Sequence, residues 1–443
     1  MTPPTPPKRK LWLDWQRGLA VLFMIQFHIL DAWISPGGKV GQEWLFTALT
    51  WIGGLAAPGF IYMAGLSQAL SDEAQARKGG DPAARRRAAI GRGLWLLGIA
   101  YLFRIFSFVA GGAWGPGWGI PYVLGVDVVS VAGFGMTLAV KLGAWHPRRP
   151  KLAVWGGLAL VLASFFWRGA WRWDGWHDIL KVDVLNIIAI GMIVSAWLSV
   201  GRPRKVALAL TAGVGLAVLF VTPWLGAALG WRDQPWFLQQ LSADPFKKLL
   251  DLPAAYLYGQ PPRSQFMLFN WIAFLLAGAT VAPLVTGKSR PFLVLGIAAA
   301  IYGLGRFIDP FVTMPVSDPT FWWINAPSWF FTRLAICIGL TGALQLLPDL
   351  LERPLAWLSV LGRQSLVAYM VSLQLTYGGS ARMMGLQHAV PLPLLLSTMV
   401  NMVVAMVVVS RAWEWWLARE KQRPAAAAHP ATAPAAASVA VAG

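Results

Sequence analysis

The chain has 443 residues, 57% of them hydrophobic and 13% charged, with a mean hydropathy of +0.55, and this composition excludes an ordinary soluble domain. The formal net charge of +18 lies mostly in short loops between apolar stretches, so no separate basic domain exists and we expect no nucleic-acid partner. One cysteine, Cys337, excludes an internal disulfide framework and a multi-cysteine metal site, and we expect no bound metal.

About twelve stretches are apolar enough to cross a bilayer, which requires about 20 apolar residues. They predict an all-α polytopic transmembrane helical bundle with about 10–12 spans, because the fifth and ninth stretches are short. Their cores are 18–34, 44–70, 93–110, 118–140, 152–167, 182–200, 206–229, 266–286, 291–305, 328–347, 355–376 and 391–416. The membrane domain is expected to cover residues 13–420, between a disordered basic arm at 1–12 and a disordered Ala/Pro-rich tail at 421–443.

The distribution of Lys and Arg predicts which side of the membrane each loop faces. If the amino terminus is inside, the inner segments carry more than twice as many Lys and Arg as the outer ones. We therefore expect both termini in the cytoplasm and the protein in a bacterial inner (plasma) membrane. The first stretch is too long for the apolar region of a cleavable signal peptide and lacks a small-residue cleavage site, so we expect it to remain as an anchor.

The first stretch contains RGLAVLFMIQFH (17–28), in which an arginine and a histidine frame an apolar run. At about 100° per residue, His28 lies about 20° from Arg17 around the helix. Asp31 lies about 40° from Arg17 on the other side, and Asp14 about 60° away, so one stripe carries all four side chains. With a rise of about 1.5 Å per residue, His28 lies roughly 16 Å beyond Arg17, which predicts a position near mid-membrane.

Other ionisable residues fall inside spans, where a charge costs at least about 2.5 to 3.5 kcal/mol and is retained when paired or functional. Arg104 in the third stretch and Asp127 in the fourth are expected at similar depth on neighbouring helices. They are expected to neutralise each other, or to line a polar cavity that contains His28, and the two interpretations are compatible. Arg333 in the tenth stretch and Asp183 near the outer end of the sixth complete the set.

His28 suits general-base work near neutral pH, because burial and a neighbouring carboxylate can shift its proton affinity in either direction. Asp31, three residues on, is expected to orient the imidazole through one ring nitrogen. The alternative is a histidine that only satisfies its hydrogen bonds within the protein core. A carboxylate and a guanidinium on the same stripe favour the functional interpretation.

The segment LDWQRGLAVLFMIQFH (13–28) resembles the first-helix pattern of integral-membrane acyltransferases, namely acyltransferase family 3 and the heparan-alpha-glucosaminide N-acetyltransferase-like proteins. The residues that match its LDxxRG motif and the following histidine are Leu13, Asp14, Arg17, Gly18 and His28. Later segments are similar in order: APGFIYMAGLSQAL (57–70), RRRAAIGRGLWLLG (85–98), VDVLNIIAIGMI (182–193) and LGRQSLVAYMVSLQL (361–375). The late motif of the family usually has a histidine where this chain has Ser372, which indicates a divergent member.

The resemblance implies transfer of an acyl group, commonly acetyl, from cytoplasmic acyl-CoA to a hydroxyl or amine of a carbohydrate or lipid-linked acceptor. Acyl-CoA is then a co-substrate, and no tightly bound cofactor is expected. Because acyl-CoA is a polyanion, a cationic inner mouth is expected to bind it. The residues of this mouth are Arg17, Arg85, Arg86, Arg87 and Arg92, although the positive-inside signal alone explains part of the run.

Within this family interpretation, His28 acts as general base or as a covalent acyl relay on an acceptor that enters from the outer side. Arg104 or Arg333 stabilises the developing oxyanion, and Asp31 and Asp127 belong to the same catalytic group. The residues expected to line the site or support its structure are Asp14, Asp183, Arg333, Arg363 and Ser372.

Two other functions stay open. A transporter or flippase would use buried His, Asp and Arg as a proton or substrate path, but no half-chain repeat and no paired broken helices at matching positions are visible in the sequence. A catalytically inactive scaffold or sensor is the third interpretation, and Ser372 favours it slightly. The oligomeric state is open, with a homodimer among the options, and membrane lipid is the expected surrounding.

Overall fold

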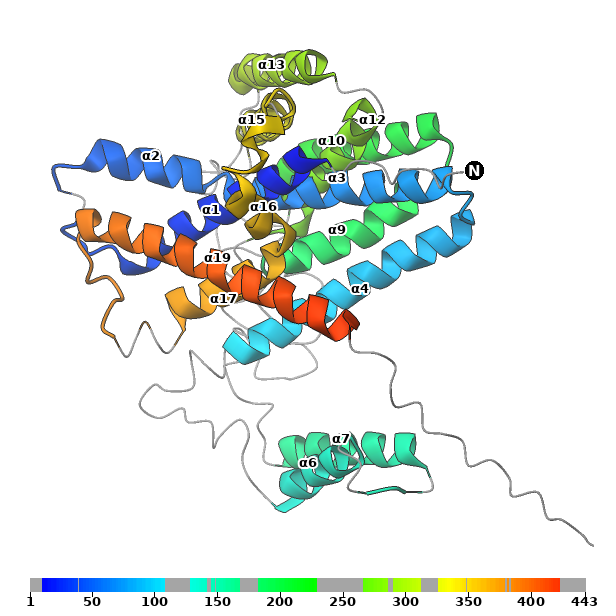
Figure 1. The fold of residues 1–443 in the computed structure, drawn as a ribbon. Helices are drawn as coiled ribbons and strands as arrows, with labels where there is room; N and C mark the ends of the chain where they lie inside the picture. Colours follow the sequence, from blue (N-terminus) through cyan, green and yellow to red (C-terminus); the bar gives the residue numbers. More distant parts are fainter. Residues whose placement is uncertain are drawn as a thin grey trace, which may run out of the picture.

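In the part of the chain that the structure describes, the regular elements are helices. The computed structural model describes residues 10–38, 40–107, 128–141, 145–147, 149–167, 182–228, 266–285, 290–311, 326–347, 349–378, 381 and 384–422. The helices in these ranges are α1 (Leu11–Trp33), α2 (Glu43–Gly53), α3 (Ala56–Arg77), α4 (Pro82–Ser107), α6 (Val128–Lys141), α7 (Pro150–Trp167), α9 (Val184–Ser199), α10 (Arg204–Ala228), α12 (Leu268–Val285), α13 (Pro291–Ile308), α15 (Pro327–Gln345), α16 (Ala356–Arg363), α17 (Ser365–Tyr377) and α19 (Leu392–Gln422), with the 3-10 turns η3 (Asp309–Phe311) and η4 (Asp349–Glu352). The described chain is therefore an all-α polytopic bundle, as its composition predicts (Figure 1).

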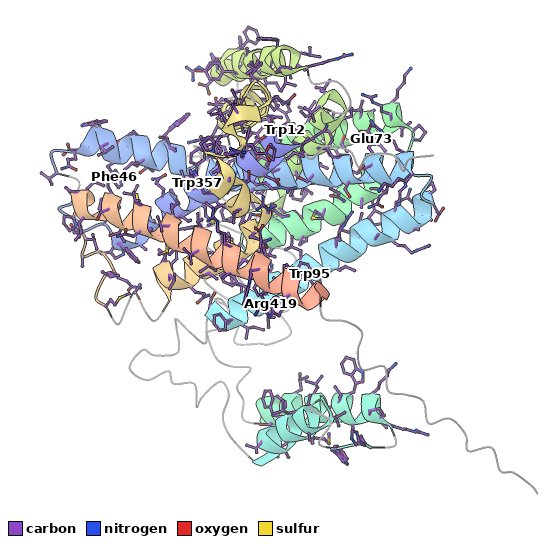
Figure 2. All side chains as sticks on the ribbon, viewed as in Figure 1. Trp12, Phe46, Glu73, Trp95, Trp357 and Arg419 are labelled. Atoms are coloured by element: carbon purple, nitrogen blue, oxygen red, sulfur yellow. The ribbon has the colours of Figure 1, made fainter. Side chains whose placement is uncertain are left out.

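The helices have the length and composition of membrane spans. Seven segments of the described residues are long and apolar enough to cross a bilayer: Glu43–Arg77, Pro82–Ser107, Arg204–Thr222, Leu268–Val285, Pro291–Phe311, Pro327–Gln345 and Leu392–Arg419. The outside of the bundle carries large apolar side chains, such as Trp95 of α4, which is 61% exposed (Figure 2). An apolar outer surface suits lipid tails rather than water. The protein is an integral membrane protein.

The second and eleventh predicted stretches are each two helices rather than one. α2 ends at Gly53 and α3 begins at Ala56, while α16 ends at Arg363 and α17 begins at Ser365. Hydropathy misses both breaks, because it averages over the few residues that interrupt each helix. In inverted-repeat transporters, broken helices lie at corresponding positions of the two chain halves. The two breaks of this chain do not correspond in this way.

The core of the bundle lies around α3, which packs against α1, α9 and α12. Glycines let α3 and α12 approach closely. A Cβ atom on Gly65 would lie 1.9 Å from the carbonyl oxygen of Leu275, and one on Gly278 would lie 2.1 Å from that of Tyr62. Small residues at such contacts are the usual means of tight helix packing in lipid, where apolar burial gives little driving force between helices.

Glycines from two sequence motifs meet where α1 crosses α16. A Cβ atom on Gly18 would lie 2.2 Å from the carbonyl oxygen of Leu358, and one on Gly362 would lie 1.8 Å from that of Asp14. Any side chain at either position would therefore push the two backbones apart. The LDxxRG segment of α1 and the LGR segment of α16 lie side by side, although most of the chain separates them in sequence.

Two candidate site residues lie near helix ends rather than at helix centres. We call the end of the bundle at which α1 begins the proximal end, and the end at which it finishes the distal end. His28 lies about 8 Å before the distal end of α1 at Trp33. Arg104 lies less than one turn before the distal end of α4 at Ser107. The mid-membrane depth expected for His28 from the sequence stays a prediction.

Candidate active site

His28 is connected to Asp31 through a third residue, Tyr377 at the distal end of α17. The Nδ1 atom of His28 lies 3.0 Å from the Tyr377 hydroxyl oxygen, and this hydroxyl donates a 2.8 Å hydrogen bond to Asp31 Oδ2. A phenol has one proton and an ionised carboxylate only accepts, so the Tyr377 hydroxyl accepts in turn from the Nδ1–H group of His28. The network thus assigns the neutral tautomer whose lone pair is on Nε2.

Asp31 is expected from the sequence to orient His28 through one ring nitrogen, and in the structure Tyr377 connects the two side chains. The carboxylate of Asp31 is on the exposed surface, and the Tyr377 hydroxyl occupies the position between it and the imidazole. Sequence reasoning missed Tyr377. The sequence does contain a signal for it, because Tyr377 comes just after the late motif segment (361–375). It ends a predicted span whose end should lie on the same side of the membrane as the end of the first span.

Aromatic packing and one backbone contact hold the imidazole in place. The rings of His28 and Tyr377 meet edge to face with centroids 5.4 Å apart, and Phe27 packs against His28 in the same way at 5.8 Å. The indole Nε1 of Trp33 donates a 2.9 Å hydrogen bond to the carbonyl of Thr376, which ties the distal end of α1 to that of α17. The side chain of His28 is half-buried, whereas Asp31 is exposed.

Arg104 forms an ion pair with Asp183, with its Nε atom 3.1 Å from Asp183 Oδ2. The other carboxylate oxygen of Asp183 caps α9 by accepting hydrogen bonds from the backbone of Leu185 and Asn186 at 2.9 and 3.2 Å. The buried carboxylate of Asp183 therefore caps the amino terminus of α9 and also neutralises Arg104. Asp127 lies outside the described residues, so its contact with Arg104 stays a prediction.

α17 also reaches the Arg104 ion pair. Tyr369, two turns before Tyr377, is buried and lies within electrostatic reach of both Arg104 and Asp183. Gln374, which lies between the two tyrosines in sequence, donates a hydrogen bond through Nε2 to the Ser107 hydroxyl at the end of α4. One helix thus contacts the His28 group and the neighbourhood of the arginine at the distal end of the bundle.

Arg333 of α15 occupies the break between α2 and α3. Its Nη1 atom donates a 2.7 Å hydrogen bond to the carbonyl of Trp51, and the guanidinium lies 4.6 Å from the ring of Trp51 and 5.5 Å from that of Trp329. The carbonyl belongs to the last turn of α2, where no intrahelical donor is available. These contacts give Arg333 a structural task at the break, and a role on an oxyanion stays a prediction.

The other three supporting residues also lie in helix contacts. Ser372 is buried and donates its hydroxyl proton to the Tyr369 carbonyl of the same helix, at 3.1 Å. Arg363 binds Glu414 of α19 with two hydrogen bonds of 2.6 and 3.0 Å. Asp14 is buried, and one of its oxygens lies 3.9 Å from a guanidinium nitrogen of Arg17.

Three of the arginines expected at the inner mouth contact the proximal half of α3. The pairs are Arg17 with the Ser67 hydroxyl, Arg92 with the Ser71 hydroxyl at 3.5 Å, and Arg85 with the Asp72 carboxylate at 2.7 Å. Arg86 donates to the Val200 carbonyl at 3.0 Å, and Arg87 is exposed. The structure therefore brings this set together at the proximal end, although Asp72 neutralises part of its charge.

The amino-terminal quarter of the chain matches a known family. Residues 9–114 match the family model described as heparan-alpha-glucosaminide N-acetyltransferase, catalytic. The matched segment includes α1 to α4, and so it contains His28, Arg104 and the basic run but not Tyr377. No curated protein matches the chain. Over residues 9–114 the chain is therefore heparan-alpha-glucosaminide N-acetyltransferase-like, which indicates a membrane enzyme of the acetyltransferase type.

Proposed function

We propose that this protein transfers an acyl group, most simply acetyl, from cytoplasmic acyl-CoA to a hydroxyl or amine of a carbohydrate or lipid-linked acceptor at the outer face. The observation that carries the proposal is the hydrogen-bond chain from His28 through Tyr377 to Asp31. It leaves Nε2 of a half-buried imidazole as the base, within the segment that matches the acetyltransferase family.

In the proposed reaction, Nε2 of His28 removes the proton from the hydroxyl or amine of the acceptor. The oxygen or nitrogen attacks the thioester carbonyl, and the tetrahedral intermediate then expels the thiolate of CoA. The proton on His28 returns to this thiolate, so the acylated product and CoA-SH leave. Tyr377 and Asp31 are positioning residues, because they hold the tautomer through Nδ1 and favour the imidazolium that forms.

Arg104 is proposed to stabilise the oxyanion of the tetrahedral intermediate. Its guanidinium has five donors in a fixed fork. Within the described residues, the ion pair with Asp183 is at Nε, and the two terminal nitrogens can then bind a second partner. The side chain is 18% exposed, against 4% for the carboxylate of Asp183, so the arginine is the more accessible partner. Fixed donors aimed at a developing charge are usually a large term in acyl transfer.

The proximal end is proposed to face the cytoplasm and to bind the phosphates of acyl-CoA. Arg17 lies at the deepest point of the row along α3, and the exposed Arg87 and Arg92 lie on the neighbouring α4. Guanidinium groups bind phosphate oxygens through paired hydrogen bonds. The acyl end would then extend along α1 toward His28. In the same orientation, both chain termini lie in the cytoplasm, as the charge bias predicts.

Stoichiometry tests this function against the transporter alternative. Full-length protein in proteoliposomes is given acetyl-labelled acetyl-CoA outside and glucosamine inside, and free thiol and acetylated sugar are measured separately. The proposal predicts one free CoA thiol outside for each acetylated sugar inside. Labelled acetyl-CoA that accumulates inside without release of thiol would identify a transporter instead. A covalent relay through His28 predicts acetyl-imidazole on the protein when the acceptor is omitted.

A further inference from the structure

α19 lies along the outside of the bundle and is longer than a membrane span needs to be (Figure 1). Its 31 residues extend over about 46 Å, whereas the hydrocarbon core of a bilayer is about 30 Å thick. The part from Leu392 to Ser410 contains no charged residue and is about 28 Å long, and Arg411 is the first charge of the helix. The uncharged part therefore matches the lipid tails, and the turns from Arg411 onward reach the lipid headgroups.

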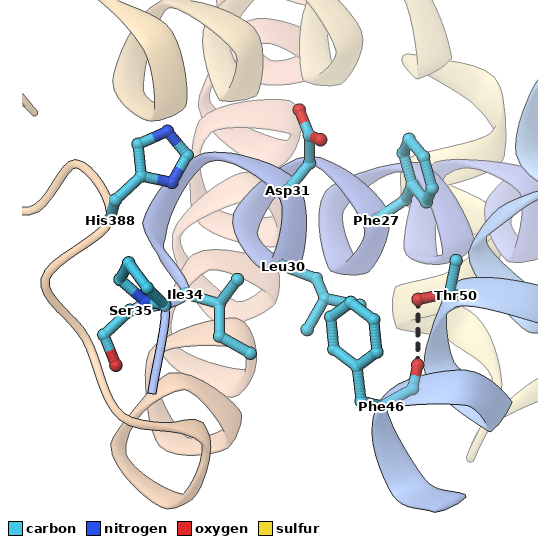
Figure 3. Close-up of a pocket in the computed structure, with 9 residues that line it drawn as sticks. Phe27, Leu30, Asp31, Ile34, Ser35, Phe46, Thr50 and His388 are labelled. Carbon is cyan, nitrogen blue, oxygen red and sulfur yellow. Dashed lines mark hydrogen bonds between the residues drawn. The ribbon is translucent and has the colours of Figure 1, made fainter. Parts of the chain in front are cut away.

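The start of α19 is attached to the distal end of α1. Val390 N donates a 2.9 Å hydrogen bond to the Trp33 carbonyl, and Ser35 N donates one of 2.9 Å to the Val390 carbonyl. Figure 3 shows the pocket at this junction, with His388 on the segment before α19 and Ile34 at the end of α1. Because α19 starts at the distal end and runs the length of the bundle, its charged last turns lie at the proximal end.

One face of α19 is exposed at the depth of the lipid tails. Val400, Val404 and Val408 recur every four residues and are 62%, 57% and 61% exposed. Leu395 and Met406 lie on the opposite side of the helix and are fully buried against the bundle. The three valines therefore form an apolar stripe that faces away from the protein, and we call them the valine stripe.

The same face continues past Ser410 with a tryptophan between two arginines. Arg411 follows Val408 by three residues, and Trp415 and Arg419 come after it at intervals of four, so all three stay on the side of the valine stripe. Both arginines are exposed, and Trp415 is 57% exposed. The guanidinium of Arg419 lies 4.0 Å from the centroid of the Trp415 ring. We call these three residues the Arg-Trp-Arg cluster.

The carboxylate nearest to the cluster in sequence is already neutralised. Glu414 faces α16, where Arg363 donates hydrogen bonds of 2.6 and 3.0 Å to its two oxygens and Gln364 donates one of 3.3 Å. The exposed face therefore keeps its two positive charges. Guanidinium groups and the indole N–H of Trp415 are donors for phosphate oxygens at the depth of the headgroups. A headgroup with a net negative charge fits best, because the choline cation of a zwitterionic lipid would lie near the same arginines.

We propose that this face of α19 binds one anionic phospholipid, with an acyl chain along the valine stripe and the phosphate at the Arg-Trp-Arg cluster. The site is independent of the reaction proposed at His28. A second copy of the chain fits this face less well. In a symmetric dimer the two clusters would meet at the same depth, and their guanidinium groups would repel each other.

Fluorescence quenching at one position tests the site in the full-length protein. Val404→Cys carries a bimane label on the valine stripe, since the native Cys337 is buried and does not compete for the label. Leu216→Cys in α10 is the matched control, because Leu216 is also exposed, at 47%, and lies far along its helix from the charged residues. Each protein is placed in phosphatidylcholine nanodiscs. These contain the same small fraction of either phosphatidylglycerol or phosphatidylcholine with brominated acyl chains, which quench bimane on contact.

At Val404→Cys, brominated phosphatidylglycerol is expected to quench at least threefold more than brominated phosphatidylcholine, because the anionic lipid is enriched at the site. At Leu216→Cys the two lipids are expected to quench equally. Equal quenching by the two lipids at Val404→Cys would overturn the proposal, and this comparison does not depend on any change to the arginines.

Two pairs of arginine substitutions then locate the headgroup. Arg411→Gln with Arg419→Gln is expected to remove the excess quenching by phosphatidylglycerol at Val404→Cys. Arg202→Gln with Arg353→Gln changes the net charge equally at two exposed arginines outside α19, and it is expected to keep the excess. An excess that survives the first pair would contradict the assignment of the headgroup. Weak quenching by both lipids in a protein that elutes as a dimer would put a second copy of the chain on this face and exclude the lipid.

Discussion

The hydroxyl oxygen of Tyr377 in α17 lies 3.0 Å from Nδ1 of His28 in α1, although most of the chain lies between the two residues in sequence. Asp31 receives the phenol proton at 2.8 Å. The tautomer of the candidate base is therefore determined by a residue of α17, outside the segment that matches the acetyltransferase family. In the proposed reaction, His28 keeps this tautomer only while α17 is packed on α1.

Tyr377→Phe removes the hydroxyl and keeps the ring that packs against His28. We expect kcat for acetyl transfer to fall by about 10- to 100-fold, because Nδ1–H loses its acceptor and the imidazole can adopt the wrong tautomer. The KM for acetyl-CoA should stay unchanged, which initial-rate kinetics would measure. Tyr302→Phe, at an exposed phenol of α13, is the matched control. Equal kcat values for the two variants would remove Tyr377 from the site.

Arg17→Gln removes a guanidinium from the proximal end of α1. We expect the KM for acetyl-CoA to rise by about tenfold or more, since a charge-assisted hydrogen bond contributes about 1.5–3 kcal/mol. The effect should shrink as ionic strength increases, because salt screens the attraction between the phosphates and the remaining arginines. Arg306→Gln, at an exposed arginine of α13, controls for net charge. A lower thermal midpoint with an unchanged KM would return Arg17 to a packing role.

Arg104→Gln and Arg104→Lys separate an oxyanion donor from a structural ion pair. Arg104→Gln should lower kcat by about 10²- to 10³-fold, the usual cost of losing one such donor. Arg104→Lys keeps the charge beside Asp183 and should recover stability, but it should recover little activity because the fixed fork of donors is lost. The measurements are kcat and the thermal midpoint of each variant. If Arg104→Lys restored both together, the arginine would serve only the ion pair.

Gly18→Ala should destabilise the bundle, because its Cβ atom would lie 2.2 Å from the Leu358 carbonyl oxygen. Overpacking of this kind typically costs about 1–3 kcal/mol, and a lower midpoint of thermal unfolding is expected. Gly91→Ala in α4 is the control, since a Cβ there meets nothing within 4 Å, and it should be neutral or slightly stabilising. Similar midpoints of thermal unfolding for the two variants would mean that α1 and α16 can move apart without loss of stability.

Periodicity along α1 predicted much of the candidate site. The angular positions of Arg17, His28 and Asp31 follow from helix geometry alone, and the structure contains a continuous helix from Leu11 to Trp33. The match over residues 9–114 agrees with the resemblance carried by the LDxxRG segment. These features are local, so a single stretch of sequence contains the information that determines them.

The contacts between distant helices could not be predicted in this way. Tyr377 and Asp183 reach His28 and Arg104 only through the packing of α17 and α9, which no local pattern encodes. The break after α2 was missed because the side chain that satisfies its free carbonyl, Arg333, comes from α15.

The role of His28 as the base is tested most directly by a comparison of two histidines of the same chain. His28→Ala removes the proposed base, and His146→Ala removes an exposed histidine between α6 and α7. Release of CoA from acetyl-CoA in the presence of glucosamine is measured for both full-length variants and for the unmodified protein, after gel filtration has shown that all three elute alike. If His28 is the base, the rate for His28→Ala is at least about 10²-fold lower and the rate for His146→Ala is unchanged. CoA release by His28→Ala at the rate of the unmodified protein would show that His28 is not the base.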